Sequence, residues 1–170
     1  FLNKKDIDII SSETLLISKS EEVEFIIAIL KFCSQPKLTN SKLDIINYLH
    51  RKNNLKTFKH TFIKRLITKN KKDFFKELHQ LNLHFDYNTL TKSSLYEAVE
   101  YIIYAFKLSN KSNNYIQFFL DFAFDYSNKN FANILDFIGH YESKKDTLSI
   151  VAPEESDAVK VMTIHKSKGL

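Results

Sequence analysis

The sequence predicts a mainly α protein, a multi-helix subdomain with a short C-terminal β-hairpin or strand pair. The first observation is composition: the 170 residues include two Gly and two Pro, and tight β-turns and phosphate-binding loops depend on Gly. The second is the spacing of apolar residues by three and four positions, which indicates amphipathic helices. The third is a change near residue 148, where the β-rich runs 148–151 and 159–164 replace the helical pattern.

Seven helices are expected, and start and stop signals locate most of them. The first is expected to begin after Ser18 or Ser20, in a segment that fits a capping box, and to end before Pro36. Ser94 and Glu97 form the clearest capping box, whereas residues 84–88 are expected to be a loop. The remaining helices are expected over about 41–53, 57–69, 73–81, 94–108, 115–126 and 130–141.

Two of the apolar features are assigned to the core. Cys33 is the only cysteine, so an intramolecular disulfide is excluded and a cytoplasmic setting is the default. Because it lies among apolar residues, a buried structural thiol is favoured over a nucleophile. An aromatic stripe at helical spacing is assigned to core packing, although stacking on nucleic-acid bases is the alternative; it comprises Tyr115, Phe118, Phe119, Phe122 and Tyr126.

Composition also excludes several classes of protein. Hydrophobic residues make up 44% and charged residues 26% of the chain, a balance typical of a globular domain. No run approaches the ~20 apolar residues of a membrane span, and residues 1–5 do not resemble a secretory signal. No Cys/His spacing resembles a zinc site. We therefore expect no metal site and no membrane partner.

Positive charge is concentrated in one region. The net charge is +5, and residues 51–80 contain ten Lys and Arg against Asp73 and Glu77. Such a region can neutralise DNA phosphates, although a solvated face of lysine-rich helices is the alternative. The candidate patch for contact with duplex DNA comprises Lys56, Lys59, Lys64, Arg65, Lys69, Lys71 and Lys72.

The last residues carry the most specific signal. A strand that ends at Ile164 would deliver polar side chains onto one turn. Thr163 and His165 lie two positions apart and so share one side of the extended chain. Lys168 supplies a point charge suited to a triphosphate, and Gly169 allows close approach of backbone N–H groups. The pattern is suggestive alone, since basic strand-to-loop turns are common on surfaces.

The run MTIHKSKGL at 162–170 resembles motif V of superfamily 1 DNA helicases of the UvrD, Rep, RecB and AddA kind. Weaker similarity covers 148–157, which resembles the segment before motif V in RecB-like proteins. The entry segment 9–16 and residues 23–36 resemble the start of the accessory subdomain of that family. The upstream similarity favours a RecB/AddA-like parent, the exonuclease V beta subunit type, over a UvrD-like one.

This resemblance implies a domain organisation and site residues. Residues 1–147 would be a helical 2B-like accessory subdomain, and 148–170 the return into the 2A motor lobe, ending within motif V. Thr163 and His165 would contact single-stranded DNA, while Lys168 and Gly169 would couple nucleotide state to DNA binding. The parent would be an ATP-dependent DNA helicase of recombination and repair, using ATP and Mg, with an exonuclease and a partner subunit if it is a helicase–nuclease.

Departures from the family limit what the chain does alone. It has no Walker A sequence, Walker B acidic pair or arginine finger, and ATP hydrolysis requires all three kinds of group. We therefore expect no catalysis and no bound cofactor in this chain by itself. Because it lacks an initiator Met and ends within a motif, it is expected to be a fragment. The alternatives are a free-standing helical module that binds nucleic acid or protein, and, less favoured, a small hydrolase built on His84 and Asp86 or on Glu154 and Glu155.

Overall fold

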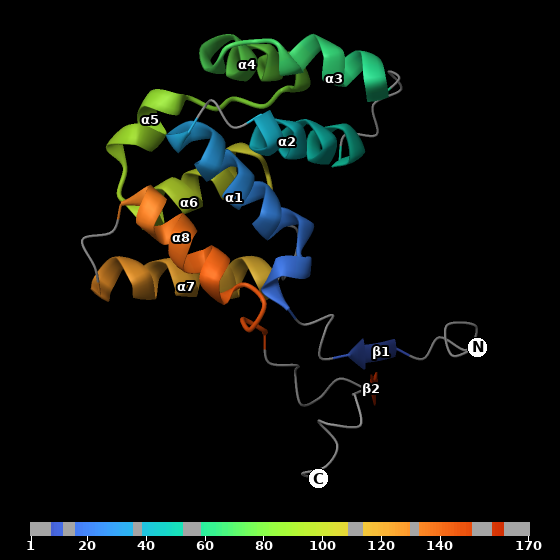
Figure 1. The fold of residues 1–170 in the computed structure, drawn as a ribbon, viewed down its shortest axis with the longest axis vertical. Coiled ribbons are helices and arrows are strands. Elements are labelled where there is room, and N and C mark those ends of the chain that lie inside the picture. The colour runs from blue at the N-terminus through green and yellow to red at the C-terminus, as the bar shows by residue number, and fades with distance from the viewer. Residues whose placement is uncertain are drawn as a thin grey trace.

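The computed structural model describes residues 8–11, 16–35, 39–52, 59–108, 114–129, 133–150 and 158–161. These residues form eight α-helices and one pair of strands, so the mainly α fold is confirmed. The helices are stacked along the long axis of the molecule, with the strands at one end and α3 and α4 at the other (Figure 1). The elements are β1 (Asp8–Ser11), the 3-10 helix η2 (Ile17–Lys19), α1 (Glu21–Ser34), α2 (Thr39–Lys52), α3 (Lys59–Ile67), α4 (Lys71–Leu78), the 3-10 helix η3 (His79–Leu81), α5 (Tyr87–Lys92), α6 (Leu95–Ala105), α7 (Asn114–Lys129), α8 (Ile134–Lys144) and β2 (Ala158–Val161).

Helix α1 is the centre of the core. Nine of its residues are buried, including the continuous run 25–30, and a helix that is apolar on every side belongs in the interior. It packs against α2, α6, α7 and α8. Ser20 caps it, accepting a hydrogen bond from the backbone N–H of Val23 at 3.4 Å. Of the two serines considered from the sequence, Ser20 is therefore the cap.

The caps confirm some predicted helix starts and correct others. The capping box of α6 is confirmed, since Ser94 and Glu97 bond reciprocally to each other's backbone N–H groups. The second helix was expected from about residue 41, and α2 is described from Thr39, with Ser41 buried inside it. The last helix begins after Asn133, which caps it, later than expected. The expected loop at 84–88 is partly wrong, because Asp86 caps α5 there.

Two lysines of α2 bond to the C-terminal ends of other helices. Lys42 is 5% exposed, and its ammonium group donates to the carbonyls of Ile67, at 2.7 Å, and Lys69 beyond the end of α3. Lys52 donates to the carbonyls of Phe106, at 2.9 Å, and Lys107, at 2.8 Å, after α6. Cations are favourable at helix C-termini, where carbonyls lack partners within the helix. These lysines therefore fasten α2 to its neighbours.

Polar bonds also join α1 to α8. Tyr141 is fully buried, and its hydroxyl donates to the Glu24 carboxylate at 2.7 Å. Glu142 forms ion pairs with Lys31 of α1 and, at 2.7 Å, with Lys145. Side chains far apart in the sequence thereby fix the last helix against the first.

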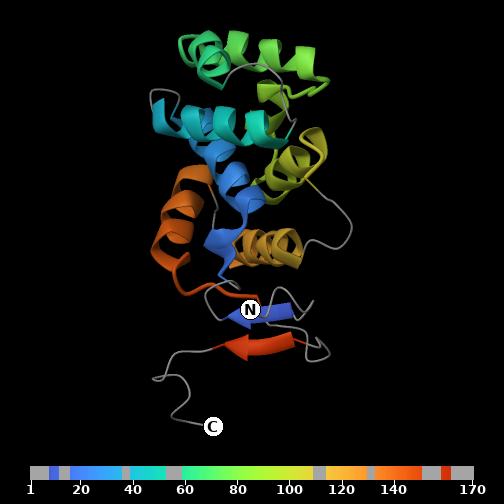
Figure 2. The same cartoon turned by 90° about the vertical axis from the view of Figure 1, so that its right-hand side faces the viewer.

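The segments that enter and leave the helical body lie side by side. β1 and β2 pair in parallel, with Asp8 opposite Ala158 and Ser11 opposite Val161, as Figure 2 shows. Next to them, Leu16 forms an antiparallel bridge with Ser149, and the N–H of Ile17 donates to the Leu148 carbonyl at 2.9 Å.

The sequence predicted a C-terminal hairpin or strand pair; a strand pair is present, but one of its strands comes from the N-terminal segment. Among the described residues, β2 pairs with β1, and the run at 148–150 contributes one bridge to Leu16. The physical reason is that β1 and β2 come from opposite ends of the sequence, and such nonlocal pairing has no local sequence signal. Residues 151–157 and 162–170 lie outside the described residues.

Candidate nucleic-acid interface

The structure disperses the basic patch that the sequence predicts. Lys59 and Lys64 are exposed on α3. Arg65 and Lys69 both form ion pairs with Glu77, at 3.6 Å and 3.3 Å, so their charge is partly neutralised. Lys56 lies outside the described residues, as do the motif V residues Thr163, His165, Lys168 and Gly169.

The two remaining lysines of the predicted patch lie at one cavity. Lys71 turns inward: its ammonium lies 3.3 Å from the centre of the Tyr87 ring and donates to the Cys33 carbonyl at 3.3 Å. Lys72 is exposed. The cavity, hereafter the lysine groove, has a volume of about 900 Å³ and lies among α4, η3, α5 and α6. It is lined by Lys71, Lys72, Phe75, Lys76, His79, His84, Phe85, Asp86, Tyr87, Asn88 and Tyr101.

Aromatic rings form the floor of the lysine groove. The ring centre of Phe85 lies 4.6 Å from that of Phe75 and 5.3 Å from that of Tyr101. Phe75 and Phe85 are each 3% exposed. The Tyr101 hydroxyl accepts a hydrogen bond from the backbone N–H of Asp86 at 2.8 Å, which fixes the start of α5 against α6. The floor is therefore packed and held in place.

The rim of the lysine groove is positively charged. It carries three lysines and one acid, Asp86, whose carboxylate already accepts bonds from the Asn88 N–H and the Thr89 hydroxyl as the cap of α5. Among the described residues, neither Lys72 nor Lys76 is in an ion pair. The groove can therefore attract an anion without first breaking an ion pair of these two lysines.

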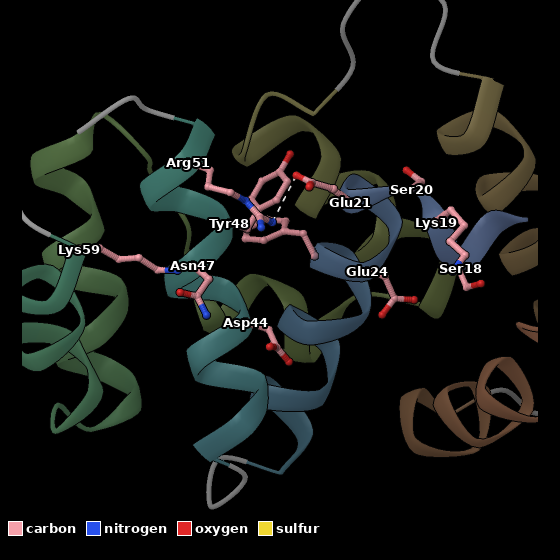
Figure 3. Close-up of a pocket in the computed structure, with 11 residues that line it drawn as sticks. Ser18, Lys19, Ser20, Glu21, Glu24, Asp44, Asn47, Tyr48, Arg51 and Lys59 are labelled. Carbon is pink, nitrogen blue, oxygen red and sulfur yellow. Dashed lines mark ion pairs between the residues drawn. The ribbon is translucent and has the colours of Figure 1, made fainter. Parts of the chain in front are cut away.

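A second cavity, of about 460 Å³, lies between α1 and α2. Figure 3 shows the Arg51–Glu21 ion pair, 3.3 Å long, at this cavity, and Lys59 extending from α3 toward Asn47. Acids and bases are mixed in its lining, which includes Glu21, Glu24, Asp44, Lys19, Arg51 and Lys59. This cavity therefore lacks the single sign of charge that would select a polyanion.

Cys33 carries no reactive chemistry in this fold. The thiol is buried, and burial raises its pKa to about 12, partly offset by the charge of Lys71. A nucleophilic cysteine needs a lowered pKa, so the predicted structural role is confirmed. Within the described ranges, no group of three His, Cys, Asp or Glu is arranged to hold a metal ion. None of the described helices combines the length and apolar character that a membrane crossing requires.

Among the residues that line the lysine groove, Lys71 and Lys72 belonged to the predicted patch, whereas the sequence did not indicate that the others would lie beside them. Lys76 had a signal, because it follows Lys72 by four positions and so shares its side of a helix. His79 was expected inside the helix over 73–81, and His84 was considered only for a hydrolase, so no signal placed these side chains or Tyr87 at a binding site. Tyr101 comes from a different helix and reaches the groove only through tertiary packing.

Fold and groove together define a class: a helical domain whose ends meet in a parallel strand pair, with a basic groove over an aromatic floor. No protein-family model matches the chain, and no curated protein and no solved structure is detectably similar to it.

Proposed function

We propose that the chain is the helical accessory subdomain of an ATP-dependent DNA helicase of superfamily 1, followed by the return into the motor lobe. The observation that carries the proposal is the parallel pairing of β1 with β2. Adjacent parallel strands require a long crossover connection, and here the whole helical body is that connection. This arrangement is what an insertion between neighbouring strands of a motor-lobe sheet requires.

The position of the motif V resemblance supports the same proposal. The run at 162–170 follows directly after β2, and ligands of open α/β sheets bind beyond the carboxyl ends of parallel strands. Thr163 and His165 would contact single-stranded DNA there, and Lys168 and Gly169 would face the nucleotide. ATP and Mg would be held mainly by other parts of the helicase, because this chain lacks a phosphate-binding loop.

The distribution of charge supports a DNA-contacting role for the helical body. Lys59 and Lys64 are exposed on α3, which lies at the end opposite the strands (Figure 1, Figure 2). They would contact DNA away from the motor, through phosphates and without sequence readout. Such a helicase would work in recombination and repair in the cytoplasm, with a partner subunit if it is of the RecB/AddA type.

The alternative is a free-standing helical module that binds nucleic acid or protein. The strand pair favours insertion, because a two-stranded sheet is marginal by itself and gains stability when further strands flank it.

The DNA-contacting role can be tested on this chain by duplex binding across a salt series. Lys59→Glu with Lys64→Glu should weaken binding and flatten the dependence on salt, by about 0.9 in logarithmic slope for each phosphate that is no longer neutralised. The matched control is Lys92→Glu with Lys144→Glu, which changes net charge equally at exposed positions on α5 and α8. Unchanged affinity and slope in the α3 variant, or an equal loss in the control, would remove α3 from the DNA interface.

A further inference from the structure

We infer that the lysine groove is a binding site for single-stranded nucleic acid, in which Lys72 and Lys76 hold backbone phosphates and the aromatic side chains at its edge stack against bases. This site is separate from the α3 surface assigned above to duplex DNA. The claim that a motor produces the single strand by unwinding duplex DNA rests on the proposed function. The claim that the groove binds single-stranded nucleic acid does not.

The shape of the groove favours a single strand. Its volume of about 900 Å³ lies near the upper end of the ~300–1,000 Å³ range of pockets that enclose small ligands. A concave site of this size can accommodate a nucleotide whose base is turned out of the strand and into the groove. A duplex presents a convex surface with its bases paired inside, and it cannot insert them into such a site.

The charges of the groove fit a phosphate backbone. Lys72 and Lys76 are four residues apart on α4, so their side chains share one face of the helix. Both are exposed, and neither is in an ion pair with a described residue. The one acid of the rim, Asp86, is occupied by hydrogen bonds at the start of α5. A polyanion therefore meets two ammonium groups without displacing an internal partner.

The aromatic rings at the edge of the groove fit nucleic-acid bases. Tyr87 and Tyr101 are half-buried and His79 and His84 are exposed, so each offers ring surface at which an unpaired base can stack. Lys71 packs against the ring of Tyr87. Phe75 and Phe85 below are only 3% exposed, so the ring surface that an occupant meets belongs mainly to the tyrosines and histidines at the edge. These observations favour nucleic acid as the occupant.

The test is fluorescence anisotropy of the chain with labelled oligothymidylate and with a hairpin duplex, across a salt series. Lys72→Glu with Lys76→Glu should weaken oligothymidylate binding by tenfold or more at low salt, and reduce the logarithmic salt slope by about 0.7 for each phosphate that is no longer neutralised. Tyr87→Ala should weaken it on the order of tenfold, and Tyr87→Phe should restore binding because the ring remains. Duplex affinity should change less in each groove variant.

Controls separate the groove from general electrostatics and from the duplex surface. Lys92→Glu with Lys144→Glu carries the same change in net charge and should leave most of the single-strand affinity. An equal loss in that control, or failure of wild type to bind oligothymidylate at low salt, would overturn the site. Binding of an acidic, aromatic-rich peptide in place of oligothymidylate would overturn it in favour of a protein occupant. If Lys59→Glu with Lys64→Glu weakens duplex binding and the groove variants do not, the result supports α3 as the duplex surface and the groove as a separate site.

Discussion

The central helix α1 and the outer helices α3 and α4 meet the requirement for burial in different ways. α1 buries nine residues around its whole circumference. α3 buries Phe62 and Leu66, and α4 buries Phe74, Phe75 and Leu78, so each covers the core with one face and exposes a basic one. The contrast shows that all-round hydrophobicity places a helix at the centre, whereas an amphipathic basic helix is placed at the surface with its cations available.

The contrast also separates two uses of lysine. Lys42 beside the core is buried and bonded to backbone carbonyls, whereas Lys72 and Lys76 on α4 are exposed. The first kind stabilises the fold, and the second is available to a ligand. Substitutions in the two regions should therefore differ in their effect on stability and on binding.

The largest expected effect on stability comes from Phe32→Ala, where the two regions meet. Phe32 of α1 is 1% exposed, and its ring centre lies 5.2 Å from that of Phe74 in α4. Removing it should lower the free energy of unfolding by about 3–5 kcal/mol, measured by urea denaturation. Leu135→Ala, at a side chain that is 46% exposed, is the control and should cost less than about 1 kcal/mol. Similar losses in both variants would contradict the central position of α1.

A smaller effect is expected from Lys42→Ala. The change removes the donor to two carbonyls after α3 and leaves them without that partner, which should cost about 2–3 kcal/mol. Lys42→Met keeps an apolar stem of similar length and should recover part of this loss. Lys64→Ala, at an exposed position of α3, should be nearly neutral in the same denaturation experiment. A neutral Lys42→Ala would show that water replaces the ammonium group.

Tyr141→Phe should have a modest effect that depends on pH. Burial and the hydrogen bond to Glu24 raise the pKa of the Tyr141 phenol above its ordinary value of 10.0. Because the unfolded chain releases this proton first, the stability contributed by the group is complete below pH 10.0 and is lost as pH rises further. Near neutral pH, the variant should be about 1 kcal/mol less stable to unfolding than the wild type. In thermal melts above pH 10.0, this difference in stability should shrink. A constant difference would contradict the raised pKa.

The smallest effect on stability is expected from Lys72→Glu with Lys76→Glu. Both side chains are exposed, and neither is in an ion pair with a described residue, so the melting curve should correspond to a change within about 0.5 kcal/mol for each substitution. The same variant is expected to lose single-strand binding. A large loss of stability would show that these lysines belong to the fold and not to a binding site.

Local signals in the sequence were enough for much of the helical fold. The Ser94–Glu97 capping box located α6, and apolar spacing located α1. The aromatic stripe of α7 was correctly assigned to packing, since Phe119 is fully buried and Tyr115, Phe118, Phe122 and Tyr126 pack against the core. The six-residue helix α5 was not predicted, because it has too few residues to show a periodicity. The pairing of β1 with β2 was not predicted, because the two strands are distant in the sequence.

The candidate site was less predictable than the fold. The count of charges identified the basic region. It did not show that Glu77 pairs with Arg65 and Lys69, or that Lys71 packs on the ring of Tyr87. Those outcomes depend on which helices become neighbours. Sequence alone therefore located the charge, and tertiary packing decides which of the lysines remain available to a ligand.

The most direct test of the proposed function is DNA-stimulated ATP hydrolysis by the product of the complete reading frame that contains this chain. The proposal predicts that single-stranded DNA accelerates hydrolysis, that His165→Ala reduces the stimulation by weakening the grip on DNA, and that Lys168→Ala lowers the rate itself. The groove variant Lys72→Glu with Lys76→Glu should retain hydrolysis, since it lies on the helical body. A wild-type protein that does not hydrolyse ATP with DNA present, or one indifferent to both motif V substitutions, would contradict the proposal.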